Sequence, residues 1–394
     1  MAAAAVNMVA DRRTSRRLRI VQGHVVAAAP GELRRTQIPP PPARYTDPDK
    51  GTLNVLLGHN RWFFYGKAQG AYSGPADCGP DMDIGRLVAA VRQEGFVIIR
   101  NALPTAWVDA CSEAFVPRLR AHIQRIGEND PKTRNRGPFR HFMDVPCCQP
   151  FVGITGCDVA IAVVRELLGQ EVAVGGLASD TPLGVPQAGG RGSVYQGVHW
   201  CAHTSISVSL SVISRLDAES DSLLAHSRMA CRDGTGLNDL DVPPECYLNW
   251  PLTDIDDENG PFEMAPGTQR LVGQCRTDGS DRYHPELAEA HRQISTGMLP
   301  LRRLHMRKGD LMIRDPRCLH RASPNLSSLD RPMLVAFFLA SVERAKSRWN
   351  FCPGMTRSTA DSLSKDQKRL LRAIRVVDEA NAHASVVENG YKLY

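Results

Sequence analysis

Four short stretches of the sequence hold residue types that could do chemistry. They are residues 195–199, which end in a histidine; residues 248–252; residues 308–313; and residues 320–331, which begin with a histidine and end with an arginine. A histidine can bind a metal ion, and an arginine can bind a carboxylate through two parallel N–H groups. Taken alone, each stretch also has an ordinary explanation, since a histidine beside a strand is more often packed or exposed than a ligand. The order and spacing of the four stretches therefore matter more than any one of them.

In that order, the stretches resemble the phytanoyl-CoA dioxygenase family of iron(II)/2-oxoglutarate oxygenases. The resemblance runs from about Ile84 to Leu339. It includes Glu-Gly-Phe-Val-Ile-Ile at 94–99, the turn sequences Asn-Gly-Pro at 259–261 and Pro-Gly-Thr at 266–268, and a histidine eleven residues before an arginine. It implies a double-stranded β-helix, also called a jelly roll, in an enzyme that uses iron(II), 2-oxoglutarate and O₂.

The resemblance also implies a role for particular residues. His199 and His320 match the two imidazole ligands of iron, and Arg331 matches the arginine that receives the far carboxylate of 2-oxoglutarate. Two imidazoles and a carboxylate on one face of iron(II) leave three coordination positions free for chemistry. Trp250 roughly matches a position in the wall of the cosubstrate site. The eleven-residue step from His320 to Arg331 is long enough for a turn and entry into an adjacent antiparallel strand.

The carboxylate ligand is not at the family's position. In the family the first histidine and the carboxylate form His-x-Asp, whereas this chain reads His199-Trp200-Cys201. Deleting residues 201–232 would join Trp200 to Asp233 and restore His-Trp-Asp. We therefore predict that Asp233 is the third ligand.

Two explanations for residues 201–232 remain open. The block can be a translated, unspliced intron, because its junction codons can supply a GT donor and an AG acceptor and splicing regenerates the tryptophan codon. It can also be a genuine insertion, because residues 205–213 alternate serine with apolar residues as a half-buried strand does. In a genuine insertion, Asp217, Asp221 or Asp233 could reach the metal from the loop.

The first 55 residues differ from the rest of the chain. They are rich in arginine, alanine and proline and poor in acids, a composition typical of an organelle transit segment. Residues 17–25 (Arg-Leu, five residues, His-Val) also come close to a peroxisomal N-terminal address. The alternative is a solvated, disordered arm. We expect residues 56–394 to form a single oxygenase-like domain, in a protein of the cytoplasm or an organelle.

Apolar patterning predicts a mainly β fold with flanking helices. The helices are expected at 83–93 with Asp83 as N-cap, from Thr105 as N-cap to about 119, at 159–168 and at 360–381. Residues 96–99 form an apolar run typical of a buried strand. From residue 172 to 339, short apolar runs alternate with turn residues, which indicates an antiparallel sandwich or barrel.

Composition narrows the class of protein. The chain has 394 residues and a net charge of +6, with much of the excess in the first forty residues, so a nucleic-acid-binding surface has little support. No apolar run approaches the ~18–20 residues of a membrane-spanning helix. The 11 cysteines form no C-x-x-C pair, which is typical of reduced thiols in an intracellular protein. Nothing in the sequence fixes the oligomeric state.

The expected reaction is hydroxylation of an unactivated C–H bond in a small or lipid-like substrate, with 2-oxoglutarate converted to succinate. A near-peroxisomal address slightly favours an acyl substrate. The alternative is a catalytically inactive β-helix protein that binds a ligand or partner, because cysteine occupies the carboxylate position at Cys201. A third class, a cupin-like metal enzyme without 2-oxoglutarate, is disfavoured by Arg331.

Overall fold

The computed structural model describes the middle of the chain with gaps. The described residues are 70–128, 139–185, 245–272, 298–348 and 354–378, with the single residues 193, 243 and 293. The predicted arm, residues 201–232, His199 and Asp233 lie outside them. No helix in the described ranges is long and apolar enough to cross a membrane.

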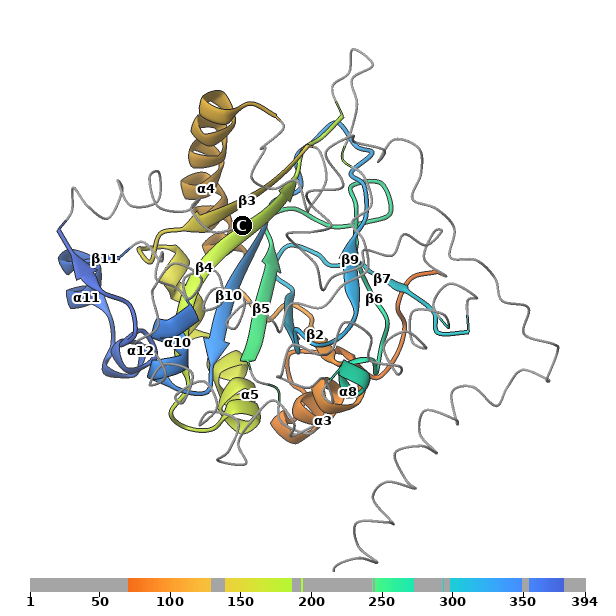
Figure 1. Ribbon diagram of the computed structural model, residues 1–394, viewed down its shortest axis with the longest axis horizontal. Coiled ribbons are helices and arrows are strands. Elements are labelled where there is room, and N and C mark those ends of the chain that lie inside the picture. Colours follow the sequence, from red (N-terminus) through yellow and green to blue (C-terminus); the bar gives the residue numbers. More distant parts are fainter. Residues whose placement is uncertain are drawn as a thin grey trace, which may run out of the picture.

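A seven-stranded sheet forms the centre of the molecule (Figure 1). Its strands in spatial order are β1 (Asp77–Cys78), β2 (Phe96–Ile99), β8 (Leu311–Arg314), β5 (Glu245–Pro251), β10 (Met333–Leu339), β4 (Ala173–Pro182) and β3 (Arg140–Val145). Apart from the parallel pair β1–β2, every pairing in this sheet is antiparallel. The strand predicted at 96–99 is β2, and it pairs with β8.

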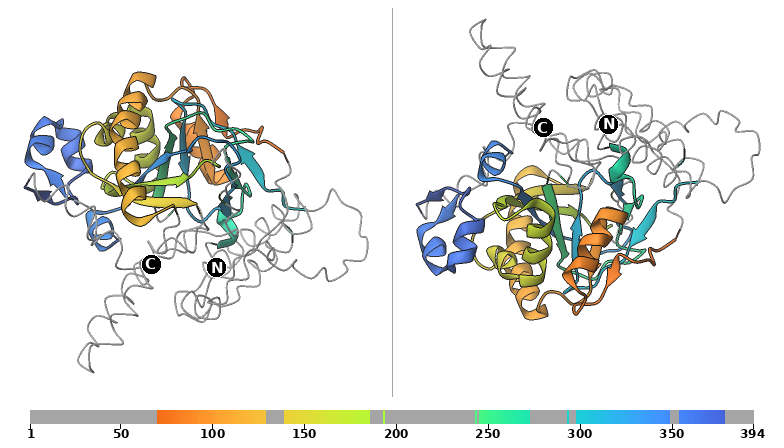
Figure 2. Two further views of the ribbon diagram at one scale, coloured as in Figure 1. Left: turned by 90° about the horizontal axis from the view of Figure 1, so that it is seen from above. Right: turned by 90° about the horizontal axis from the view of Figure 1, so that it is seen from below.

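A second, three-stranded antiparallel sheet lies beside the β5–β8 part of the large sheet (Figures 1 and 2). Its strands are β7 (Arg302–Leu304), β6 (Phe262–Met264) and β9 (His320–Ala322). Arg314 of β8 lies over the ring of Phe262 of β6, so side chains of the two sheets meet between them. The mainly β, jelly-roll fold with flanking helices that the sequence predicts is confirmed.

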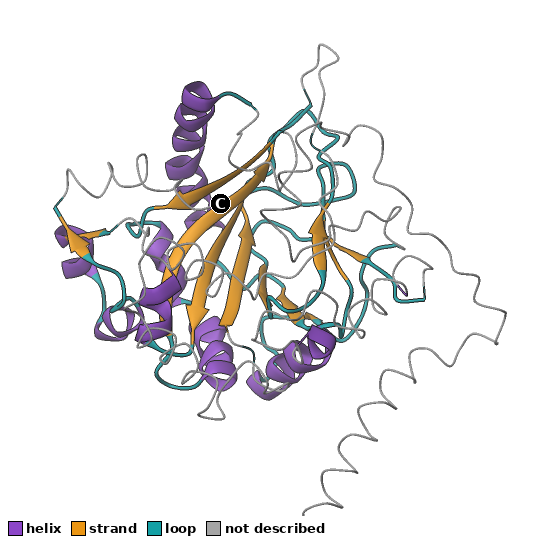
Figure 3. Cartoon of the chain, viewed as in Figure 1, coloured by secondary structure: helices purple, strands orange, loops and turns teal. Residues whose placement is uncertain are grey.

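Three helices cover one face of the large sheet (Figures 2 and 3). They are α3 (Ile84–Glu94), α4 (Thr105–Ile126) and α5 (Asp158–Leu168). Asp83 caps α3 by accepting from two backbone N–H groups, as predicted. Thr105 is not the N-cap of α4: Pro104 holds that position without a side-chain cap bond, and Thr105 is already helical.

The C-terminal region contains several short elements. It has α10 (Val342–Arg348), β11 (Met355–Thr356), α11 (Arg357–Ser362), α12 (Lys365–Leu370) and β12 (Val376–Val377). The single helix predicted at 360–381 is wrong, because Ser364 and Gln367 form a capping box that starts a new helix. The segment then enters β12, which pairs with β11.

Alternation along β10 and β5 separates the two faces of the large sheet. Leu334, Ala336 and Phe338 join the helix-covered core, whereas Val335 and Phe337 join a separate cluster on the opposite face. We call this opposite face, which is directed toward the small sheet, the inner face. Residues directly opposite in an antiparallel ladder share a face. Asn249, which is opposite Val335 in the ladder, therefore belongs to the inner face.

Candidate functional site

His320 begins strand β9 and is 2% exposed. Its Nδ1 donates a hydrogen bond of 2.7 Å to the carbonyl oxygen of Cys318, so Nε2 carries the lone pair. A metal-binding histidine characteristically donates its other ring N–H to such a partner. The imidazole also stacks on the ring of Phe262, with centroids 5.1 Å apart. His320 thus has the tautomer and the fixed orientation of a metal ligand.

The two turn sequences singled out in the sequence hold both ends of β9. In the turn at 266–268, the Thr268 hydroxyl accepts from the backbone N–H of Leu319 at 2.8 Å and donates to the Ala265 carbonyl at 2.7 Å. In the turn at 259–261, Gly260 adopts a φ of 87° directly against the backbone of Ser323 and Pro324. These turns therefore fix the backbone immediately before and after the strand that carries His320.

Arg331 is fully buried two residues before β10. Its backbone N–H donates to the Pro182 carbonyl at 3.1 Å, which continues the pairing of β10 with β4. Because Arg331 is four residues before Val335, an extended chain directs it to the same inner face. Its three guanidinium nitrogens have no hydrogen-bond partner in the described part of the chain. Burial, reinforced by the charge of Arg140 and opposed by Asp180, lowers the pKa of Arg331 to about 9.

The environment of Arg331 fits an anionic ligand. A buried charge is costly unless it is paired and hydrogen-bonded, and a planar guanidinium pairs best with a carboxylate. A carboxylate of the predicted cosubstrate would supply the hydrogen-bond partner that the Arg331 guanidinium lacks among the described residues.

Arg140 of β3 is a second buried cation beside Arg331, and sequence analysis missed it. It lies opposite Pro182 in the ladder, next to the carbonyl that receives the Arg331 N–H. Arg140 is bound by Asp180 at 3.1 Å, and it donates at 2.9 Å to the carbonyl of Ser323, just after β9. It therefore links the large sheet to the end of the strand that carries His320. No motif signals this residue, because its position depends on the pairing of β3 with β4.

The connection from His320 to Arg331 crosses between the sheets. Entry into an adjacent strand was the expectation, but β9 belongs to the small sheet and β10 to the large one. Asn325 holds the connection: its amide donates to the carbonyls of Pro182 at 3.3 Å and Leu329 at 2.7 Å. The crossing places His320 and Arg331 on two different sheets that face each other.

Trp250 does not lie where the cosubstrate-wall prediction requires. It is opposite Leu334 in the ladder, and its ring packs on Trp107 of α4 with centroids 5.8 Å apart. Successive side chains of a strand point to opposite faces, so Trp250 belongs to the helix-covered face. The structure therefore does not bring it to Arg331, and the neighbouring Asn249 occupies the inner face instead.

The other two predicted metal ligands, His199 and Asp233, lie outside the described residues. Within the described ranges, no group of three His, Cys, Asp or Glu side chains could hold a metal ion. The three-ligand site therefore stays a prediction, and His320 is its described member.

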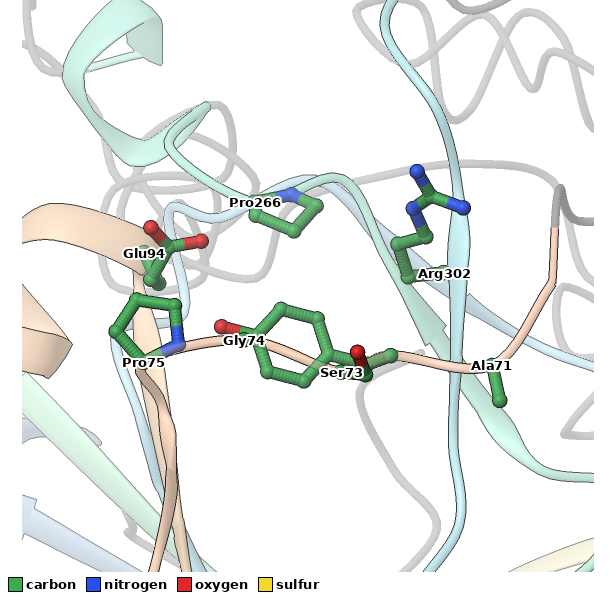
Figure 4. A pocket seen from close by; sticks show the side chains of 8 residues that line it. Ala71, Ser73, Gly74, Pro75, Glu94, Pro266 and Arg302 are labelled. Atoms are coloured by element: carbon green, nitrogen blue, oxygen red, sulfur yellow. The ribbon is translucent and has the colours of Figure 1, made fainter.

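A separate pocket lies away from these residues. It has a volume of about 290 Å³ and lies between residues 71–75 and the turn at Pro266, with Glu94 and Arg302 at its two ends (Figure 4). Neither His320 nor Arg331 lines it.

The described residues of the predicted site are an inward histidine on the small sheet and a buried arginine just before a central strand of the large sheet. Residues 240–333 match the family model of phytanoyl-CoA dioxygenase (PhyH). This segment contains His320, Arg331 and both turns. This match confirms, over residues 240–333, the resemblance seen in the sequence.

Several solved structures are similar at low identity. The epimerase SnoN in complex with Fe³⁺, α-ketoglutarate and nogalamycin RO gives 17% identity and a TM-score of 0.42, over 65% of this chain and 83% of that one. The carbocyclase SnoK from nogalamycin biosynthesis gives 16% and 0.43, over 68% and 87%. HygX from Streptomyces hygroscopicus, with nickel and 2-oxoglutarate bound, gives 17% and 0.38, over 74% and 94%.

Proposed function

We propose that the chain is a non-haem iron(II)/2-oxoglutarate dioxygenase that hydroxylates an unactivated C–H bond of a small or lipid-like substrate. In this reaction one atom of O₂ enters the new hydroxyl group and the other enters succinate, while 2-oxoglutarate loses CO₂. The observation that carries the proposal is the fully buried guanidinium of Arg331, which has no described partner and lies across the sheets from His320.

Each residue has a distinct task in this proposal. His320 offers Nε2 to iron, because the Cys318 carbonyl holds the proton on Nδ1. His199 and Asp233 are proposed to complete the ligand set. When bound, the iron supplies the O₂ chemistry that no side chain can. Arg331 binds the far carboxylate of 2-oxoglutarate, and the surrounding apolar side chains exclude water from the reacting atoms.

One sequence feature favours a second candidate, a protein that binds a ligand without turnover. The chain as printed reads His199-Trp200-Cys201, so a cysteine thiol occupies the position at which the family's His-x-Asp motif has its carboxylate. This candidate predicts that 2-oxoglutarate and iron do not form their chelate on the protein.

An anaerobic titration with iron(II) and 2-oxoglutarate tests the proposal, with the visible charge-transfer band of the chelate as readout. Two forms of the protein are compared: the chain as printed and a chain without residues 201–232. A band only in the shorter form would identify the block as an artefact and His-Trp-Asp as the native motif. A band in the printed chain would mean that the block is genuine. Folded protein with no band in either form would reject the oxygenase and support the binding protein.

A further inference from the structure

Arg314 is a further buried arginine between the sheets, and the proposed function does not use it. Arg314 ends strand β8 and is 5% exposed. It is opposite Tyr247 in the ladder, next to Asn249, which places it on the inner face. Its Nε donates to the Asn249 side-chain oxygen at 3.1 Å.

The guanidinium of Arg314 lies between two aromatic rings. Its central carbon is 4.6 Å from the ring centroid of Tyr247 on the large sheet and 5.1 Å from that of Phe262 on the small sheet. Cation–π contacts of this kind stabilise the faces of a guanidinium, but they do not use the N–H groups at its edge. Nη1 is buried and has no hydrogen-bond partner among the described residues. Arg314 thus has a fixed plane and an unused donor at its edge.

Arg314 is close to His320, the described member of the predicted metal site. The ring of Phe262 contacts both residues: it is 5.1 Å from the guanidinium carbon and 5.1 Å from the imidazole centroid of His320. The two groups are therefore at most about 10 Å apart, within the reach of one small molecule.

We propose that Arg314 binds a carboxylate of the primary substrate, so that the substrate is a small carboxylic acid. This inference rests on the proposed function and names its substrate class. A guanidinium presents parallel N–H donors that match a carboxylate in its own plane, and the two rings already hold that plane in place. A preorganised donor loses less conformational freedom on binding. Arg331 then anchors the cosubstrate and Arg314 the substrate, with His320 on the facing sheet.

Binding of acids to the full-length protein, loaded anaerobically with iron(II) and 2-oxoglutarate, tests this assignment. Benzoic, cinnamic and octanoic acids are each compared with their primary amides, first by calorimetry and then by their stimulation of succinate formation. An amide has the shape of the acid without its charge, so Arg314 should favour at least one acid over its amide by about tenfold or more. Arg314→Gln should remove this preference, Arg314→Lys should keep part of it, and Arg86→Gln, an exposed change on α3, should leave it intact.

The outcomes separate this inference from the proposed function. If the native protein forms the iron/2-oxoglutarate chelate but binds no acid more tightly than its amide, the acid-binding role is wrong and the oxygenase remains. If Arg314→Gln loses 2-oxoglutarate binding while Arg331→Gln retains it, Arg314 anchors the cosubstrate and our assignment is overturned. Because the acid–amide comparison uses the unaltered protein, the absence of a preference rejects the inference even if Arg314→Gln does not fold, and Arg314→Lys can then assign an observed preference to Arg314.

Discussion

Arg331 is a buried cation whose described surroundings give it no counter-ion. Such a residue destabilises the ligand-free folded protein, because its hydration is lost without a compensating ion pair. The same residue stabilises the complex with 2-oxoglutarate, because a charge-assisted hydrogen bond in a site without water is strong. Stability and ligand affinity should therefore respond in opposite directions when the charge is removed.

We predict such opposite effects for Arg331→Met, which keeps most of the volume. The free energy of unfolding of the ligand-free protein should stay the same or rise, by up to about 4 kcal/mol. The affinity for 2-oxoglutarate should fall by about tenfold to a hundredfold. Urea unfolding and chelate titration measure the two effects, with Arg86→Met as an exposed control. A strong loss of ligand-free stability would mean that Arg331 has a structural partner.

The lowered pKa of Arg331, about 9, predicts a pH dependence of cosubstrate binding. Below pH 9 the guanidinium is charged and can bind the carboxylate, whereas the folded protein loses this charge as the pH rises through 9. Because the unfolded chain keeps the proton at that pH, the ligand-free stability should rise while 2-oxoglutarate affinity falls. Titrations on both sides of pH 9 measure this, and Arg331→Gln should lack this loss of affinity.

Strand β9 is short, and its position depends on the turns at its ends. A glycine at 260 is needed for two reasons: its φ of 87° is unfavourable for other residues, and a Cβ would lie 2.7 Å from the Pro324 carbonyl oxygen. Gly127 has a similar φ of 85° but open space around its Cβ position. A comparison of the two glycines therefore separates the energetic cost of the backbone conformation from the cost of a steric clash at Cβ.

We predict that Gly260→Ala destabilises the protein more than Gly127→Ala. Both changes carry a backbone strain of about 1–3 kcal/mol, and only the change at 260 also places a Cβ against the segment that follows β9. Chemical unfolding compares the two free energies, and iron affinity reports the displacement of His320. Equal costs at the two positions would show that the segment moves aside freely.

Thr268 offers a second test of how β9 is held. Thr268→Val keeps the shape of the side chain but removes the acceptor of the Leu319 N–H, leaving that buried group unsatisfied at a cost of about 1–3 kcal/mol. Thr105→Val, in the exposed first turn of α4, is the matched control and should change stability by no more than about 0.5 kcal/mol. A loss of iron affinity only in the first variant would support a positioning role for the turn.

In the whole molecule, the large and the small sheet each contribute one described residue to the proposed site. A ligand that binds only the folded state stabilises it by about 2.7 kcal/mol at a hundred times its Kd. Iron(II) and 2-oxoglutarate should therefore each raise the melting temperature of the native chain. In Arg331→Met the increment from 2-oxoglutarate should vanish while the increment from iron remains, as measured by anaerobic thermal unfolding. Loss of both increments would place Arg331 in the metal site itself.

The resemblance to the phytanoyl-CoA dioxygenase family, together with two residues of the proposed site, was predictable from the sequence alone. His320 and Arg331 could be predicted because they lie within one continuous stretch at a characteristic spacing. The turns at 259–261 and 266–268 were also predictable, since turn residues act through local backbone geometry. Their contacts with β9 explain why they accompany the histidine.

Which face of a sheet each residue occupies, and which distant residues meet, follows from the folded chain and not from the sequence pattern. Trp250 was misplaced because a shift of one residue along a strand exchanges the faces of the sheet. Arg140 and Arg314 carry no motif, and they approach the site through the pairing of β3 with β4 and of β8 with β5. A buried charge becomes informative only when its neighbours are known, because burial and pairing are properties of the folded chain.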